Sequence, residues 1–236
     1  MTTARTAAVI GVGPGLGMSI AHRLGREGYS VALVSRSDRR HADYVSALAD
    51  AGVKAEAFVA DVGNRDQLLS TLDAIGPVDL LYYGPGAADL DAPRSSITEA
   101  TADEVRQAMT GVYPAMDIVN QVLPGMLERG EGGLLFAGGL SAVQPIPFLG
   151  AFAVSSAALR NYVLTLNAGL TGTGVYAGTL TIGGLIERGD IHQLVLSQPE
   201  KFGGVPSRTL DPDEIAETAW RLYTERDRAE AVVSVF

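Results

Sequence analysis

The chain has 236 residues, of which 47% are hydrophobic and none is cysteine, and it carries a formal net charge of −9. This length and apolar content fit one large globular α/β domain over residues 1–236. The acidic balance argues against a nucleic-acid partner, the absence of cysteine excludes thiolate and disulfide chemistry, and scattered histidines predict no metal site. We recognise no signal peptide and no membrane-spanning run, so we expect a cytoplasmic protein without a membrane partner.

A glycine-rich turn near the amino terminus organises the rest of the chain. The apolar run at residues 7–10 predicts a buried strand, and Leu16, Ile20 and Leu24 give the next segment one apolar helical face. Glycines at such a turn let the main chain approach a pyrophosphate, and the helix N-terminus adds free N–H groups. A tight turn without a ligand is the alternative, and the density of glycines favours binding. The predicted cradle comprises Gly11, Gly13, Gly15, Leu16 and Gly17.

The spacing Gly11-x-x-x-Gly15-x-Gly17 resembles the coenzyme turn of the short-chain dehydrogenase/reductase (SDR) family. The resemblance covers essentially the whole chain. It implies a single Rossmann-type, doubly wound parallel sheet of about seven strands with helices on both faces. After the first strand and helix, we expect strands at residues 29–34, 53–60, 78–83, 133–137, 174–182 and 231–235. Helices are expected at residues 41–51, 65–75, 98–128 (interrupted near Gly111 and Pro114), 151–170 and 212–224.

The end of the second predicted strand favours NADP(H) over NAD(H). In dinucleotide-binding folds an acidic residue about 20 positions beyond the glycines holds the ribose 2′-hydroxyl, whereas an arginine suits a 2′-phosphate. Here Ser35 stands where the acid is expected, and Arg36 follows it. A guanidinium can pair with phosphate through two hydrogen bonds. The alternative for Arg36 is a solvated helix start, which is how we interpret Arg39 and Arg40.

The resemblance implies further coenzyme contacts after the third and fourth strands. Asp61 and Val62 would lie against the adenine ring, although Asp61 could instead cap the next helix. Gly84 and Gly86 occupy the family's Asn-Ala-Gly segment, with glycine in place of the asparagine.

The segment after the sixth strand is expected to cover the nicotinamide end. Gly184 precedes a residue, Leu185 or Ile186, whose backbone would contact the carboxamide in the resembled family. The family's mobile substrate lid corresponds to residues 186–208, and we expect residues 188–206 to be irregular.

The residues expected to carry the family's chemistry are replaced in this chain. The family uses an asparagine, a serine and a Tyr-x-x-x-Lys pair, in which the lysine lowers the tyrosine pKa and the tyrosine transfers a proton. The resemblance aligns these positions with Gly111, Gly139, Phe152 and Ser156. Phenylalanine has no proton to give, so the usual alcohol–ketone mechanism cannot run on the usual residues. The candidate replacement donors, each more simply explained as structural, are Ser141, Tyr113 and Tyr83.

We therefore expect an atypical NADPH-binding oxidoreductase acting on a small organic substrate. Hydride addition to an iminium carbon gives a neutral amine, and addition to a conjugated C=C bond gives an enolate that can take its proton from water. A non-redox role stays open: a coenzyme-binding pseudoenzyme, a cyclase or lyase, or an inactive partner subunit. Because the family's long helices, here 98–128 and 151–170, pack against their copies, we also expect a homodimer or homotetramer.

Overall fold

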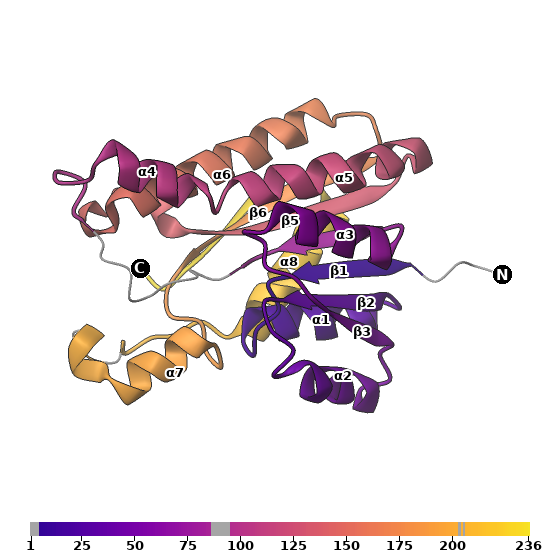
Figure 1. Ribbon diagram of the computed structural model, residues 1–236, viewed down its shortest axis with the longest axis horizontal. Helices are drawn as coiled ribbons and strands as arrows, with labels where there is room; N and C mark the ends of the chain where they lie inside the picture. The colour runs from indigo at the N-terminus through magenta and orange to yellow at the C-terminus, as the bar shows by residue number, and fades with distance from the viewer. Residues whose placement is uncertain (1–4, 86–94, 203, 205) are drawn as a thin grey trace.

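The computed structural model describes residues 5–85, 95–202, 204 and 206–236. Its centre is a seven-stranded parallel sheet with the strand order β3-β2-β1-β4-β5-β6-β7 (Figure 1). The chain steps outward from β1 in both directions, so the order reverses between β1 and β4, as in a doubly wound fold. The strands are β1 (Thr6–Ile10), β2 (Ser30–Ser35), β3 (Ala55–Val59), β4 (Leu80–Tyr83), β5 (Gly132–Gly139), β6 (Val175–Gly183) and β7 (Glu230–Ser234).

Helices cover both faces of the sheet (Figure 1). One face packs against α1 (Leu16–Arg26), α2 (His41–Asp50) and α8 (Pro212–Glu225). The other packs against α3 (Arg65–Ile75), α5 (Tyr113–Arg129) and α6 (Gly150–Gly169). The predicted fold class is therefore confirmed.

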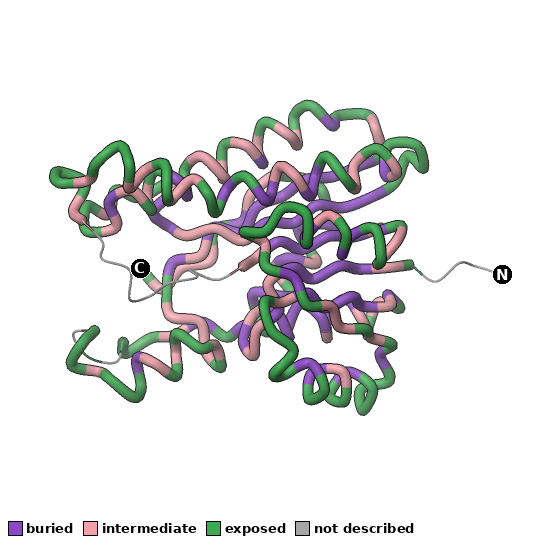
Figure 2. The backbone as a smooth tube through the Cα atoms, in the orientation of Figure 1, coloured by how far each residue is buried: buried purple, intermediate pink, exposed green. Residues whose placement is uncertain are grey.

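Side-chain alternation along the strands divides the core into two layers. In β1, Ala7 and Val9 join the layer under α1 and α8, whereas Ala8 and Ile10 join the layer under α3 and α5. All four of these β1 residues are fully buried, and Figure 2 shows the central strands as the most continuously buried part of the chain. A strand covered on both faces reads as an unbroken apolar run, which is why the sequence of β1 does not alternate.

The helix expected at residues 98–128 is two helices, α4 (Ala102–Met109) and α5. Thr101 caps α4 in a capping box with Glu104, so the helix begins four residues later than expected. The break falls near Gly111, as predicted, and Pro114 stands in the first turn of α5, where proline is tolerated.

The expectation of an irregular lid at residues 188–206 is wrong. This segment contains α7 (Asp190–Ser197) and a short 3₁₀ helix, η3 (Pro199–Phe202). Residues 203 and 205 lie outside the described part of the chain.

Helix α6 is long and strongly apolar. With the preceding 3₁₀ turn η2 (Pro147–Leu149) it is, among the described residues, the one helical stretch long and apolar enough by composition to cross a membrane, and 22% of that window is buried. Here it lies along β5 and β6 as a sheet-covering helix. Its Arg160 is paired with Glu230 of β7 through hydrogen bonds of 2.7 and 2.5 Å.

Candidate active site

The glycine turn between β1 and α1 is fixed to the strands on either side. The N–H groups of Gly11 and Val12 donate to the Val34 carbonyl of β2, at 2.9 and 3.0 Å. Beyond β4, the N–H of Gly84 donates to the Ile10 carbonyl at 3.0 Å. The turn therefore lies at the carboxyl edge of the sheet where the strand order reverses, the place at which parallel α/β folds bind ligands.

The glycines of the turn serve different purposes. Gly11 has a φ of +90°, and a Cβ atom on it would lie 2.5 Å from Pro85 Cα. A Cβ on Gly17 would lie 2.8 Å from Val12 Cα, so both positions require glycine for the fold itself. No described atom lies within 4 Å of the Cβ position of Gly13. Gly13 thus borders open space that a ligand can occupy.

Helix α1 presents an uncapped N-terminus beside this space. Gly15 is its N-cap residue and supplies no side-chain cap, and the first turn contains no acidic residue. The first N–H groups of a helix have no intrahelical partner and lie at the positive end of the helix dipole. The arrangement suits an anionic group such as a pyrophosphate.

The loop after β2 carries the three predicted arginines. Ser35 Oγ lies 3.0 Å from the Ser37 carbonyl oxygen and 2.8 Å from Nε2 of His41, the first residue of α2. The Arg36 side chain is exposed and has no ion pair or hydrogen bond among the described residues. Arg40 is exposed at the start of α2, as expected, and forms a two-bond ion pair with Asp190 of α7, at 2.9 and 2.7 Å.

Asp61 lies next to Ser35 at the same edge of the sheet, because Ala60 N donates to the Ser35 carbonyl at 3.0 Å. The Asp61 carboxylate accepts from Gly63 N at 2.9 Å. Asn64 caps α3, so the alternative of Asp61 as the helix cap is wrong. Val62 is partly buried and packs against the core layer under α3 and α5.

Two tyrosines precede Gly84, and both are core residues. Tyr82 and Tyr83 are 1% exposed, and the Tyr82 hydroxyl fills the place of a Cβ on Gly84. The Tyr83 hydroxyl donates to the Gly111 carbonyl at 3.2 Å, and burial raises the Tyr83 pKa. Tyr83 is therefore a structural residue and no replacement proton donor. Gly86 lies outside the described residues.

Several positions expected to carry catalysis come together where β5 ends. A Cβ on Gly139 would lie 3.6 Å from Ser141 Oγ and 4.0 Å from Phe152 Cε1. Ser141 belongs to the 3₁₀ turn η1 (Leu140–Ala142) and is 8% exposed, and its Oγ is buried without a hydrogen-bond partner among the described residues. Phe152 is 39% exposed, whereas Ser156, one turn further along α6, is 8% exposed.

The other two positions considered for catalysis are Gly111 and Tyr113. The Gly111 carbonyl accepts from the Tyr83 hydroxyl, and Tyr83 packs in the core layer under α5 and α6. Tyr113 opens α5 and is 52% exposed. The structure therefore brings Gly139, Ser141 and Phe152 together.

The backbone beyond β6 distinguishes between Leu185 and Ile186. Leu210 N donates to the Leu185 carbonyl and Glu187 N donates to the Leu210 carbonyl, both at 2.9 Å. In this parallel bridge the N–H and C=O of Ile186 point away from Leu210. Ile186 is thus the residue whose backbone is available to a ligand, and Gly184 lets the chain pass close to Leu210.

The segment expected to be the lid, residues 186–208, begins next to the glycine turn. A Cβ on Gly15 would lie 3.0 Å from the Glu187 carbonyl oxygen and from Gly189. The next residue, Asp190, is the one held by Arg40, which keeps the pKa of the Asp190 carboxyl below its usual range. One end of this segment therefore spans the carboxyl edge from β6 to α2.

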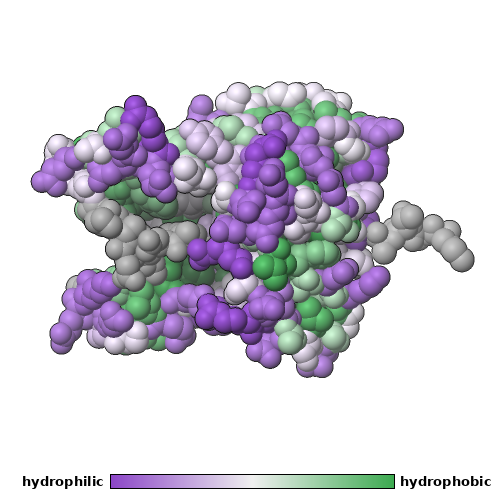
Figure 3. All heavy atoms as spheres, in the orientation of Figure 1, coloured by the Kyte–Doolittle hydropathy of each residue, from purple (hydrophilic) through white to green (hydrophobic). Residues whose placement is uncertain are grey.

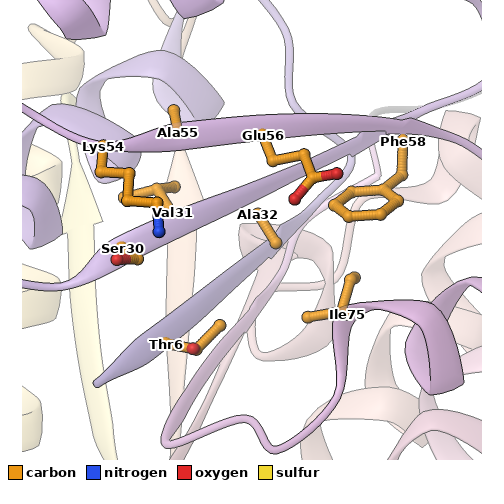
Figure 4. Close-up of a pocket in the computed structure, with 9 residues that line it drawn as sticks. All are labelled: Thr6, Ser30, Val31, Ala32, Lys54, Ala55, Glu56, Phe58 and Ile75. Atoms are coloured by element: carbon orange, nitrogen blue, oxygen red, sulfur yellow. The ribbon is translucent and has the colours of Figure 1, made fainter. Parts of the chain in front are cut away.

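Exposed apolar side chains occur on both sides of this edge. They are Phe148 and Phe152 near the start of α6, and Ile191, Leu196 and Phe202 within residues 186–208. Apolar residues among the hydrophilic ones of α7 are visible in Figure 3. A separate hollow of about 270 Å³ lies at the opposite, amino edge, lined by Thr6, Ser30, Val31, Ala32, Lys54, Ala55, Glu56, Phe58 and Ile75 (Figure 4). None of its lining residues is a predicted site residue, and the functional edge of such sheets is the carboxyl one.

The comparison with known proteins identifies the family. The family model described as short chain dehydrogenase matches residues 5–187. The chain belongs to the short chain dehydrogenase family.

Similar proteins in this family carry out several reactions. The ketoacyl reductase HetN of Nostoc is 29% identical over 205 residues, which cover 85% of this chain and 70% of the relative. A short chain dehydrogenase of Pseudocercospora fijiensis is 31% identical, over 76% of this chain and 59% of its own length. The 2-(S)-hydroxypropyl-CoM dehydrogenase 3 of Xanthobacter autotrophicus is 28% identical, over 96% and 87%.

Solved structures of the same fold include coenzyme complexes. The 3-oxoacyl (acyl-carrier-protein) reductase of Agrobacterium tumefaciens with NADP bound superposes with a TM-score of 0.82 at 22% identity, covering 98% of this chain and 93% of that one. The L-sorbose reductase of Gluconobacter frateurii, complexed with NADPH and L-sorbose, gives 0.81 at 21% identity, covering 98% and 95%.

Two contacts at the carboxyl edge could not be found from sequence. His41 and Asp190 carry no motif, and each acts on a predicted loop residue through its side chain. The one available signal was the position of His41 at the start of α2, directly after the arginines.

Proposed function

We propose that this protein is an NADPH-binding oxidoreductase that reduces a small organic substrate without the tyrosine–lysine pair of its family. The observation that carries the proposal is that an open glycine turn occurs together with a cluster at the end of β5 in which Gly139 and Phe152 carry no titratable group. Gly13 borders open space, whereas Gly139 and Phe152, side by side, offer no titratable group. The similar proteins with bound NADP or NADPH support the choice of coenzyme.

The chain's own groups fit the parts of this coenzyme. The backbone around Gly13 and the uncapped start of α1 would hold the pyrophosphate. Arg36 would pair with the 2′-phosphate, and Asp61, Val62 and Gly84 would line the adenosine side. The free backbone groups of Ile186 would hold the carboxamide. When bound, the reduced coenzyme supplies a hydride.

The missing proton donor restricts the substrate. A ketone that gains a hydride becomes an alkoxide and needs a proton, and neither Phe152 nor Gly139 can provide or relay one. An iminium carbon gains the hydride and becomes a neutral amine. A conjugated C=C bond gains the hydride at its β-carbon and leaves an enolate, whose oxygen can accept a hydrogen bond from Ser141 before carbon is protonated by water. We propose activated C=N or C=C bonds as the substrates for this reason.

The test begins with NADPH and NADH titrations of the purified protein, followed by NADPH consumption with cyclic iminium ions, enones and ketones. The expected result is NADPH binding, with turnover of an iminium or enone at least tenfold faster than that of a matched saturated ketone. Binding of neither coenzyme would refute the proposal. Binding without any hydride transfer would favour the non-redox alternatives instead.

We also propose that the protein self-associates through α6. This helix is apolar along its length but is only partly covered by the sheet, and Val154 on it is 40% exposed. Exposed apolar surface of this kind marks an interaction site. A homodimer or homotetramer would cover it, as would a related partner subunit.

A further inference from the structure

The side chains of Ser35 and His41, which lie at the two ends of the loop between β2 and α2, contact each other. Ser35 Oγ contacts the Ser37 carbonyl at 3.0 Å and His41 Nε2 at 2.8 Å. The backbone N–H of His41 donates to the Asp38 carbonyl at 2.9 Å. Arg36 stands between Ser35 and Ser37, so the backbone on both of its sides is fixed by these bonds.

The contact between Ser35 and His41 has one arrangement that satisfies all three polar groups. The Ser37 carbonyl can only accept, so the Ser35 hydroxyl donates to it, and His41 donates from Nε2 to Ser35 Oγ. His41 is 9% exposed and is therefore held in place by its surroundings. A buried donor at the loop's end can hold the hydroxyl, and with it the turn, in one geometry.

The arginines of this loop differ in the partners that the structure gives them. Arg40 forms an ion pair with Asp190, and the positive charge of Arg39 also lowers the pKa of the Asp190 carboxyl. Arg36 has no partner among the described residues. Arg39 likewise forms no hydrogen bond or ion pair among the described residues, but Arg36 directly follows Ser35, so its guanidinium is the free one nearest the end of β2.

We propose that His41 is a positioning residue that holds the Ser35–Ser37 turn so that Arg36 is set for the 2′-phosphate, and that it thereby determines the preference for NADPH over NADH. The inference rests on the proposed coenzyme and adds a residue that does not touch it. A flexible arginine loses side-chain and backbone freedom when it binds a phosphate, and a turn fixed in advance reduces that cost. The expected gain applies only to a ligand that carries the 2′-phosphate.

The experiment compares 2′,5′-ADP with 5′-AMP, and NADPH with NADH, by calorimetric titration. His41→Phe keeps an aromatic ring in the buried position and removes the donor, whereas His41→Gln keeps a donor near the place of Nε2. Ser35→Ala removes the other partner. Arg36→Ala, alone and combined with His41→Phe, shows whether both residues act through one interaction. Thermal melts of each variant verify that it is folded.

The expected result is a three- to tenfold loss of the NADPH/NADH affinity ratio in His41→Phe and Ser35→Ala, about the contribution of one hydrogen bond. The ratio for 2′,5′-ADP against 5′-AMP falls equally, NADH affinity stays within about twofold, and His41→Gln recovers most of the loss. In the Arg36→Ala background His41→Phe has no further effect.

A merely structural His41 would weaken NADPH and NADH alike and leave the ratio unchanged, which would overturn the inference while leaving the proposed function intact. An additive effect of His41→Phe on top of Arg36→Ala would overturn it as well. A wild-type protein that binds neither coenzyme would refute the proposed function and this inference with it.

Discussion

Gly13→Ala separates the ligand role of the glycine turn from its role in the fold. The Cβ position of Gly13 has no described atom within 4 Å, and its φ is not in the left-handed region, so the methyl group fits the free protein. Such a substitution stabilises by about 0.4–1 kcal/mol, because alanine loses less backbone freedom on folding. The melting temperature should therefore stay level or rise by about 2–4 °C, as expected for a domain of this size.

Coenzyme binding should respond in the opposite direction. The methyl group would occupy space that a pyrophosphate needs and would displace at least one charge-assisted hydrogen bond, worth about 1.5–3 kcal/mol. The expected loss of NADPH affinity is about ten- to hundredfold. Gly169→Ala, at another open position near the end of α6, is the matched control and should leave binding unchanged. Gly17→Ala should instead lower the melting temperature, since its Cβ would lie 2.8 Å from Val12 Cα.

Fluorescence titration and differential scanning calorimetry of these three variants check the reasoning. Gly13→Ala with wild-type NADPH affinity would show that the turn is not a pyrophosphate cradle, whatever the protein's function. A fall in its melting temperature would show that the open space beside Gly13 is needed by the fold.

Ion pairs and exposed apolar groups give three more expected outcomes. Arg160→Met removes two hydrogen bonds to Glu230 and should lower the unfolding free energy by about 1.5–3 kcal/mol at pH 7, measured in urea. Because Arg160 lowers the Glu230 pKa, this stabilisation is present above the carboxyl's unfolded value of 4.5 and is lost as pH falls through the lower folded value. A stability difference that does not narrow on acidification below pH 4.5 would contradict the assignment. Asp190→Asn breaks an exposed pair with Arg40, so the unfolding free energy should change by less than about 1 kcal/mol. Proteolysis within residues 186–208 should accelerate, and unchanged cleavage would show that the Arg40–Asp190 pair does not hold this segment in place. Val154→Glu should convert the assembly to monomers in light scattering, and a monomeric wild type would refute self-association through α6.

The regular elements of the fold could be predicted because their patterns are local. Helix α3 matches the expected residues at both ends, and the strand positions agree within about two residues. Helix α7 was missed although Ile191, Leu194 and Val195 have helical spacing, because the surrounding polar residues and the resemblance to a mobile lid favoured a loop. The start of α4 was misplaced because the Thr101–Glu104 capping box was overlooked.

The parts of the site that depend on main-chain geometry could be predicted from the sequence. The parts that depend on contacts between distant side chains could not. Gly11 and Gly17 could be recognised from spacing, since a close backbone approach requires glycine. The pair formed by Arg40 and Asp190 joins residues 150 positions apart, and no local pattern encodes it. The role of Tyr83 depends on whether its hydroxyl meets a carbonyl or a cavity, and only the structure shows that it meets Gly111.

The Ser141 hydroxyl is the feature of the proposed site that favours ligand binding over a loss of function. A buried hydroxyl without a hydrogen bond costs about 1–3 kcal/mol, and native proteins keep few such groups. Ser141 Oγ lies 3.6 Å from the place that a side chain at Gly139 would begin to fill, so the glycine leaves room beside the hydroxyl. An oxygen atom of a substrate, an enolate or a water molecule placed there would accept the unused hydrogen bond. In the proposed site, Gly139 and the Ser141 hydroxyl would form a small polar position next to the apolar ring of Phe152, which would suit an activated and mainly apolar substrate.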